Sequence, residues 1–245
     1  NTAVTSLSGA GTSIGEIDTG QGSNLTNLIN WAAASNPAQH YGLVVWDHGG
    51  GLSGTCWDDS SNGDNLTLSE FRSAVDASNV DHFGFIGFDA CLMGMTEQAF
   101  DLASLADVMV ASQELEPGDG WDYDVFLNQL KANPSMTPEQ LAASIVTSYA
   151  PQYAGQADIT LAATRLAGMA SLETSLDTFV ARALALPASS ADWTNMRTAA
   201  QHCREFPSGG GYDYADLGQF MGQVAGLVTD STLRTAALNV ETALN

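Results

Sequence analysis

The chain alternates short apolar runs with segments whose apolar residues recur at helical spacing. Four runs have the length and the β-branched or aromatic content of buried strands, namely residues 41–46, 82–88, 108–111 and 159–163. The first two, YGLVVW and HFGFIGF, are each followed directly by an aspartate. These runs predict a sheet of four strands, which is small for the number of helices that the rest of the chain predicts.

Helical patterns fill the segments between and after these strands. Residues 25–32 place Leu, Ile and Ala three and four positions apart, after a Ser or Asn that can cap a helix. Thr67 and Thr137 each precede a Glu or Gln by three positions, which is the capping-box pattern of a helix start. Residues 166–245 are mostly helical in pattern. Strands that alternate with helices are typical of an α/β fold with a parallel sheet.

Reactive or polar residues follow three of the predicted strands. His48 lies just beyond the first strand, Cys91 just beyond the second, and Ser112 just beyond the third. In an open parallel sheet, ligands bind outside the carboxyl ends of the strands. We therefore expect these three side chains to lie at one edge of the sheet.

A Cys and a His at this edge are sufficient for acyl transfer. The Cys91 thiolate attacks a carbonyl carbon, and the His48 imidazole exchanges protons with the thiol and the leaving amine. The N–H of Gly49 is a candidate oxyanion donor, because a glycine lets the substrate approach closely. We also expect a helix to begin at Cys91, since a helix N-terminus lowers the pKa of a thiol. Taken alone, a Cys after a strand is usually a small buried hydrophobe.

The excess of acidic over basic residues indicates which classes of partner the protein can bind. The 245 residues include 28 Asp and Glu against 7 Lys and Arg, a net charge of -21. Such a surface repels nucleic acid and anionic membranes and attracts cationic peptides. No apolar run approaches the roughly 18 residues that a membrane span needs, so we expect no span. The acidity also suits a secreted or cell-surface protein.

The three cysteines do not predict a metal site. Cys56, Cys91 and Cys203 have none of the C-x-x-C or H-x-x-x-H spacings of zinc sites. An odd number leaves at least one thiol unpaired within the chain. We interpret Cys56 as a buried thiol, and a disulfide between Cys56 and Cys203 stays open.

The segments quoted above resemble the clostripain family of cysteine peptidases, which shares a clan with caspases, gingipains and legumain. The strand-His-Gly and strand-Ala-Cys signatures of that clan correspond to YGLVVWDHGGG and FGFIGFDACLMG. Further family-like segments lie in family order, namely GEIDTG, TCWDDSSNGDNLTLSEF, ASQELEPGDGWDYDVFLNQL and YDYADLGQF. The resemblance covers nearly the whole chain. It implies a caspase-like α/β/α sandwich with a mostly parallel sheet, a catalytic core over residues 1–165, and a helical region over residues 166–245 packed on the same domain.

The resemblance also implies an activity, which is hydrolysis of peptide bonds after Arg or Lys with the same Cys and His as nucleophile and acid/base. A buried guanidinium must be paired with an acid at the base of its pocket. Asp119 in the EPGDGW loop best matches the family's pocket acid. Asp89 is the second candidate, and it has an alternative structural role beneath the nucleophile. We interpret Glu114 and Glu116 as residues that order the loop.

This chemistry requires no cofactor, although calcium activates some members of the family. Residues 58–64 resemble the first half of an EF-hand loop. The carboxylate expected at position 12 falls at position 13, as Glu70, so we interpret the match as a coincidence. Calcium stays open as an activator, and we assign it no site.

The start of the chain departs from the family pattern. The family fold begins with strands upstream of GEIDTG, whereas this chain begins only a few residues before that segment. We therefore expect an N-terminal fragment to complete the sheet, because an incomplete sheet exposes an edge that can pair. The first basic residue is Arg72. Proteolytic processing at a basic residue would therefore fall before Asn1 and not in the loop after His48.

Two alternative functions stay open. A non-catalytic binding or structural module could retain the caspase-like fold, because fold does not imply function. A peptidase of the same clan could cleave after Asn. Cleavage after Asp is disfavoured, because the P1 carboxylate would lie near the like charges of Asp119 and Asp89.

Overall fold

A four-stranded sheet lies at the centre of the protein, whose computed structural model describes residues 13–208 and 214–245. The strands are ordered β1-β4-β5-β6, with β1, β4 and β5 parallel and β6 antiparallel to β5. Their bounds are Gly42–Trp46, Phe83–Asp89, Ala106–Ala111 and Ala162–Arg165. The mostly parallel sheet is confirmed, although its fourth strand begins three residues later than predicted.

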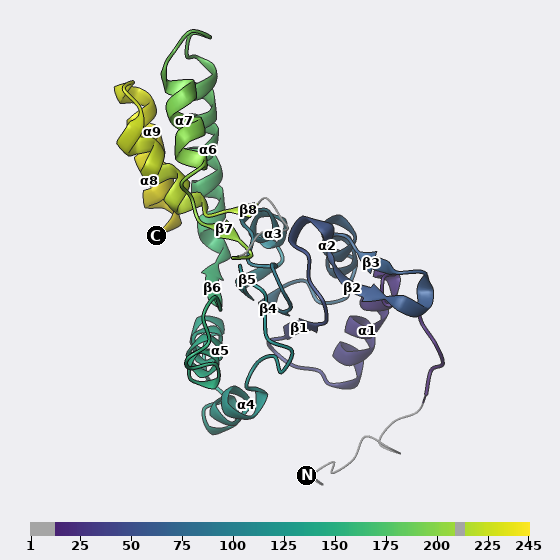
Figure 1. Ribbon diagram of the computed structural model, residues 1–245. Helices are drawn as coiled ribbons and strands as arrows, with labels where there is room; N and C mark the ends of the chain where they lie inside the picture. Colours follow the sequence, from purple (N-terminus) through teal and green to yellow (C-terminus); the bar gives the residue numbers. More distant parts are fainter. Residues whose placement is uncertain (1–12, 209–213) are drawn as a thin grey trace.

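Helices cover both faces of this sheet, as Figure 1 shows. One face packs against α1 (Gly22–Ser35), α2 (Leu68–Asp76) and α3 (Thr96–Leu102), and the other packs against α4 (Tyr123–Ala132) and α5 (Pro138–Gln152). Neighbouring residues of each strand point to opposite faces, so the two apolar layers are separate. The three layers form the α/β/α sandwich that the sequence predicted.

Capping chemistry fixes the starts of two helices as the sequence predicted. The Thr67 backbone N–H donates to the Glu70 carboxylate at 3.0 Å, and the Glu70 N–H donates back to the Thr67 hydroxyl at 3.2 Å. The same reciprocal pair joins Thr137 and Gln140. Each capping box satisfies two N–H groups that the first turn leaves without an intrahelical acceptor.

The loop after His48 contains a hairpin that the sequence pattern did not reveal. Strands β2 (Thr55–Asp58) and β3 (Asp64–Leu66) pair antiparallel, with an irregularity at Cys56, whose φ is +61°. Residues 58–64, which resemble the first half of an EF-hand loop, form the turn that connects these two strands. The Asp58 carboxylate accepts N–H groups from Thr19 at 2.9 Å and from Ser60 at 2.9 Å, so it orders the turn.

The last third of the chain forms a helical bundle that extends from the sheet in Figure 1. Its helices are α6 (Met169–Leu184), α7 (Asp192–Ala200), α8 (Leu217–Leu227) and α9 (Ser231–Leu244), with the short strands β7 (Glu205–Phe206) and β8 (Tyr214–Ala215) between α7 and α8. One continuous cluster of buried apolar residues runs from the sheet into the bundle. None of the described helices has the length and apolarity needed to cross a bilayer.

Candidate active site

The register of β1 and β4 brings the two candidate catalytic residues to the same level. Trp46 at the end of β1 pairs with Asp89 at the end of β4. His48 and Cys91 each lie two residues beyond this pair, so both leave the sheet at one edge. His48 is exposed and Cys91 is half-buried. The parallel strands therefore bring the two residues to the same edge of the sheet, which is the edge where ligands bind in such folds.

Gly49 runs directly against the backbone of the nucleophile. A Cβ added at Gly49 would lie 2.1 Å from the carbonyl oxygen of Cys91. Gly49 lies opposite Thr55 in an isolated antiparallel bridge. The residues on either side make its hydrogen bonds, one of which runs from the Gly50 N–H to the Gly54 carbonyl oxygen at 3.0 Å. The Gly49 N–H is therefore not used by the bridge, as an oxyanion donor requires.

The segment that carries Cys91 is a turn, and the expected helix start at Cys91 is wrong. Helix α3 begins at Thr96, and Leu92 adopts a φ of +63°, which no helix accommodates. The thiol instead accepts a hydrogen bond from the backbone N–H of Glu116, with 3.2 Å between N and Sγ. Leu92 N–H also donates to Glu114 O at 3.1 Å. The loop after β5, and not a helix N-terminus, therefore contacts the thiol and the turn that carries it.

Asp89 is buried beneath the nucleophile and holds the EPGDGW loop in place. Its side chain accepts the backbone N–H of Trp121 at 3.1 Å and the hydroxyl of Tyr123 at 2.8 Å. Gly120, with a φ of +65°, packs so closely that an added Cβ would lie 2.6 Å from Asp89 Oδ2. These contacts fit the structural alternative for Asp89, since a buried carboxylate requires such donors.

Asp119, the other candidate pocket acid, lies on the exposed part of the same loop. The next residue, Gly120, is anchored through its carbonyl, which accepts the hydroxyl of Tyr153 at 2.6 Å. Burial raises the pKa of Tyr153, and the charge of Asp119 adds to this effect. The two predicted pocket acids therefore occupy different positions, one at the surface of the loop and one beneath it.

A third carboxyl group, that of Glu116, lies close to Asp89 and to the Cys91 thiol. It is hydrogen-bonded to Asp89 and lies 3.5 Å from the indole N–H of Trp121. Burial, the hydrogen bond to Asp89 and the charge of Asp89 together raise the pKa of Glu116 to about 10. The sequence predicts a loop-ordering role for Glu116, and no local sequence signal distinguishes this half-buried acid from the exposed acids nearby.

Glu114 anchors the same loop to the C-terminal part of the chain. Its carboxylate accepts the guanidinium of Arg204 at 2.8 Å and the backbone N–H of Ser208 at 3.0 Å. Burial pushes the pKa of Glu114 upward, but the hydrogen bonds from Ser208 and Arg204 outweigh it and hold the pKa below its ordinary value. This arrangement fits the interpretation of Glu114 as a loop-ordering residue.

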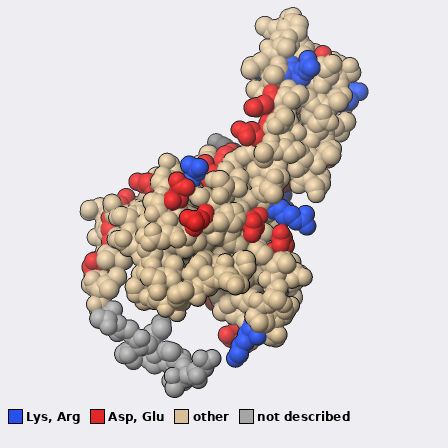
Figure 2. Space-filling model, turned by 180° about the vertical axis from the view of Figure 1, so that it is seen from behind, with Lys and Arg blue, Asp and Glu red and all other residues tan. Residues whose placement is uncertain are grey.

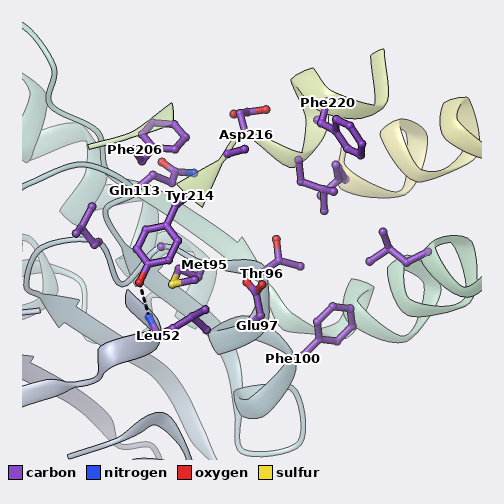
Figure 3. A pocket seen from close by; sticks show the side chains of 17 residues that line it. Leu52, Met95, Thr96, Glu97, Phe100, Gln113, Phe206, Tyr214, Asp216 and Phe220 are labelled. Atoms are coloured by element: carbon purple, nitrogen blue, oxygen red, sulfur yellow. Dashed lines mark hydrogen bonds between the residues drawn. The ribbon is translucent and has the colours of Figure 1, made fainter. Parts of the chain in front are cut away.

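A cavity of about 820 Å³ lies between the loops that follow His48 and Cys91 and the helical bundle (Figure 3). Tyr214 reaches from β8 across one side of it to the loop after His48. The Tyr214 hydroxyl accepts the N–H of Leu52 at 3.0 Å and donates to Gly50 O at 2.9 Å. The YDYADLGQF segment thus braces the His48 loop, a contact between residues more than 160 positions apart that sequence reasoning missed.

The described residues offer neither a disulfide nor a recognisable metal centre. The three cysteines Cys56, Cys91 and Cys203 are free thiols. Across residues 13–208 and 214–245, no three His, Cys, Asp or Glu side chains lie close enough together to hold a metal ion.

The chain is similar in sequence to a known family of peptidases. A family model described as the Clostripain family, Peptidase C11, matches residues 8–243. Clostripain from Hathewaya histolytica is 32% identical over 137 residues, which is 48% of this chain and 26% of clostripain.

Two solved structures share the fold. An inactive zymogen of a C11 protease from Parabacteroides distasonis has a TM-score of 0.68 and 21% identity, over 94% of this chain and 61% of that chain. A secreted C11 cysteine protease from Bacteroides thetaiotaomicron, in complex with an irreversible peptide inhibitor, has a TM-score of 0.63 and 23% identity, over 90% of this chain and 60% of that chain. The chain thus spans less than two thirds of each relative. Because the family model covers nearly the whole sequence, the protein belongs to the clostripain family of cysteine peptidases.

Proposed function

We propose that the protein is a cysteine endopeptidase that cleaves peptide bonds after Arg or Lys, with Cys91 as nucleophile and His48 as acid/base. The observation that carries this proposal is the register of β1 and β4, which brings both residues to one edge of the sheet. The close approach of Gly49 to the Cys91 carbonyl adds to it, because the His48 loop and the nucleophile turn are in direct backbone contact.

The reaction follows from these positions. His48 takes the thiol proton, and the Cys91 thiolate attacks the carbonyl carbon of the P1 residue. The Glu116 N–H stabilises the thiolate before attack. The Gly49 N–H is placed to donate to the oxyanion, and His48 then protonates the leaving amine. Water, deprotonated by His48, hydrolyses the thioester and restores the free thiol.

The preference for a basic P1 residue rests on the acids around the nucleophile. Asp119 is available at the loop surface, and Asp89 with Glu116 lies beneath Cys91. Figure 2 shows Lys and Arg as isolated side chains on one face, whereas acidic side chains gather where the helical bundle meets the sheet. An acidic surface attracts cationic peptides, and a guanidinium forms strong paired hydrogen bonds with carboxylates.

A set of fluorogenic peptides that differ at P1 tests this proposal. We expect wild-type protein to cleave the Arg and Lys peptides, Cys91→Ala to cleave none, and Asp119→Asn to lose preference for Arg. Cleavage after Asn would instead support the alternative specificity. The absence of turnover with every peptide, with reductant present and calcium varied, would favour the non-catalytic module.

The exposed edge of the sheet supports the proposal of an N-terminal fragment. Within the described residues, β1 has a hydrogen-bonded neighbour on one side only. Trp46 on β1 and Trp31 on α1 are 66% and 65% exposed, beside a groove of about 650 Å³. We propose that a strand from an N-terminal fragment of this protein covers this apolar edge. Co-expression with the encoded upstream segment should blue-shift tryptophan emission and raise the unfolding midpoint, and unchanged values would contradict the proposal.

We also infer that the protein is secreted or lies at the cell surface. The similar C11 protease from Bacteroides thetaiotaomicron is described as secreted, and the net charge of -21 suits an extracellular setting. Immunodetection in culture medium and in cell fractions tests this inference, and recovery from the cytoplasm alone would contradict it.

A further inference from the structure

The carboxyl groups of Glu116 and Asp89 are hydrogen-bonded to each other beneath Cys91, and neither forms a salt bridge within residues 13–208 and 214–245. Asp89 is 3% exposed, and its partner Glu116 approaches it from the loop after β5. The titratable groups whose charges act on Glu116 or respond to it are Asp89, Cys91, Tyr123, Tyr149 and Tyr153. Each of these side chains is neutral when protonated and negative when deprotonated, so none of them supplies a positive charge. A buried acidic group without a cation is costly, so this arrangement is incomplete without a positively charged ligand.

Two buried polar atoms of the groups that interact electrostatically here have no hydrogen-bond partner among the described residues. They are Oε2 of Glu116 and the hydroxyl of Tyr149, a residue that is only 2% exposed. Burial raises the pKa of Tyr149, and the charges of Glu116, Asp89 and Cys91 add to this effect, which places the hydroxyl in their field. Buried polar groups are normally paired, so these atoms mark where a ligand's hydrogen-bond donors are expected.

The carboxyl pair must hold a proton while the site is empty. Two carboxylates offer acceptors alone, so a hydrogen bond between Glu116 and Asp89 requires one of them to be protonated. Burial and the neighbouring Asp89 raise the pKa of Glu116 to about 10. Asp89 already accepts two hydrogen bonds at Oδ2, from the Trp121 N–H and the Tyr123 hydroxyl. Glu116 is therefore the member that carries the proton.

We propose that Glu116 is a specificity-determining residue of the P1 site, where a cationic P1 side chain displaces the proton that Glu116 shares with Asp89. This inference rests on the proposed cleavage after Arg or Lys. The Glu116 N–H lies 3.2 Å from Sγ, so the P1 side chain of a bound peptide starts close to Glu116. The guanidinium of Arg has five donors, enough for both carboxylates and the unpartnered Tyr149 hydroxyl.

The exchange balances in charge and in protons. The empty site holds one neutral carboxyl and one carboxylate, and the occupied site holds a cation between two carboxylates. One proton leaves to solvent for each ligand bound. By linkage, the affinity for a cationic P1 side chain rises about tenfold per pH unit while Glu116 is protonated in the free protein and ionised in the complex. A neutral P1 side chain of the same shape releases no proton.

Isothermal titration calorimetry in two buffers of different ionisation enthalpy counts the protons released. The protein is the full chain with Cys91→Ala, which binds peptide without cleaving it. The ligands are two peptides that are identical except for Arg or citrulline at P1, since citrulline is a neutral isostere. We expect release of about one proton with the Arg peptide and none with the citrulline peptide. Adding Glu116→Gln, which keeps the hydrogen bond to Asp89, should abolish the release.

A second readout uses active protein. The KM for a P1 Arg peptide should fall as pH rises in wild type and should be nearly independent of pH in Glu116→Gln, with kcat less affected. Binding of the Arg peptide without proton release, or equal release by the Glu116→Gln variant, would overturn the role of Glu116 and leave the peptidase assignment intact. Failure of wild type to bind or cleave Arg and Lys peptides would instead refute the basic specificity and this inference with it.

Discussion

Replacing Gly49 with Ala tests most sharply the close backbone contact between the loop after His48 and the turn that carries Cys91. The new Cβ would lie 2.1 Å from the Cys91 carbonyl oxygen and 3.0 Å from Cγ of Met93. Ordinary contact begins at 3.4 Å, so the two backbones must separate by about 1 Å. Met93 can rotate away, but the Cys91 carbonyl belongs to the turn that holds the thiol.

This displacement should affect stability and catalysis by different amounts. Overpacking of this kind costs about 1–3 kcal/mol of unfolding free energy. A displacement of about 1 Å between reacting groups costs about a hundredfold in rate. We therefore expect kcat/KM for a P1 Arg peptide to fall about a hundredfold in protein that urea titration shows to be folded.

Gly168→Ala provides the matched control. Gly168 has a φ of -77°, and nothing lies within 4 Å of an added Cβ. This substitution should leave activity unchanged and change stability by less than about 1 kcal/mol. Full activity in Gly49→Ala, or equal losses in both variants, would refute the backbone contact on which the active-site geometry depends.

Three further predictions follow from buried polar groups. Tyr123→Phe removes a donor to the buried carboxylate of Asp89 and should lower the unfolding free energy by about 1–3 kcal/mol in a urea titration, whereas an unchanged midpoint would contradict that contact. Ionised Glu114 stabilises the folded state because its folded pKa is depressed, and this contribution disappears as pH falls. Glu114→Gln should therefore be less stable than wild type at pH 7, and the difference in unfolding free energy should shrink below about pH 4. A difference that stays constant with pH would contradict the lowered pKa of Glu114 in the folded state. Burial raises the pKa of Cys56 to about 11, so iodoacetamide at pH 7 should modify Cys91 well before Cys56 in a peptide map, and the reverse order would count against the assignment.

The elements that the sequence predicted well are those with strong local signals. The apolar runs of β1 and β4 and the capping boxes at Thr67 and Thr137 are each specified within a few residues. The hairpin of β2 and β3 lacks such a signal, because its strands are short and polar and pair around the irregularity at Cys56. Local pattern therefore predicts the strands that carry the site, but not the loops that shape it.

The missed parts of the site depend on long-range contacts. The predicted helix at Cys91 fails because Leu92 turns the chain and the loop after β5 supplies the N–H that reaches the thiol. The Glu116 carboxyl group interacts with Asp89, 27 positions away, and with Tyr149 from α5. Neither neighbour can be read from the residues beside Glu116, although the EPGDGW motif identifies the loop.

The most direct test of the central claim is covalent labelling of Cys91. A peptide acyloxymethyl ketone with Arg at P1 is incubated with the full protein, and intact mass and peptide mapping locate the adduct. We predict one adduct per chain on Cys91, none in Cys91→Ala, and slow labelling by the matching Asp probe. No adduct on Cys91, or an equal reaction at Cys56 or Cys203, would contradict the assignment of Cys91 as the nucleophile.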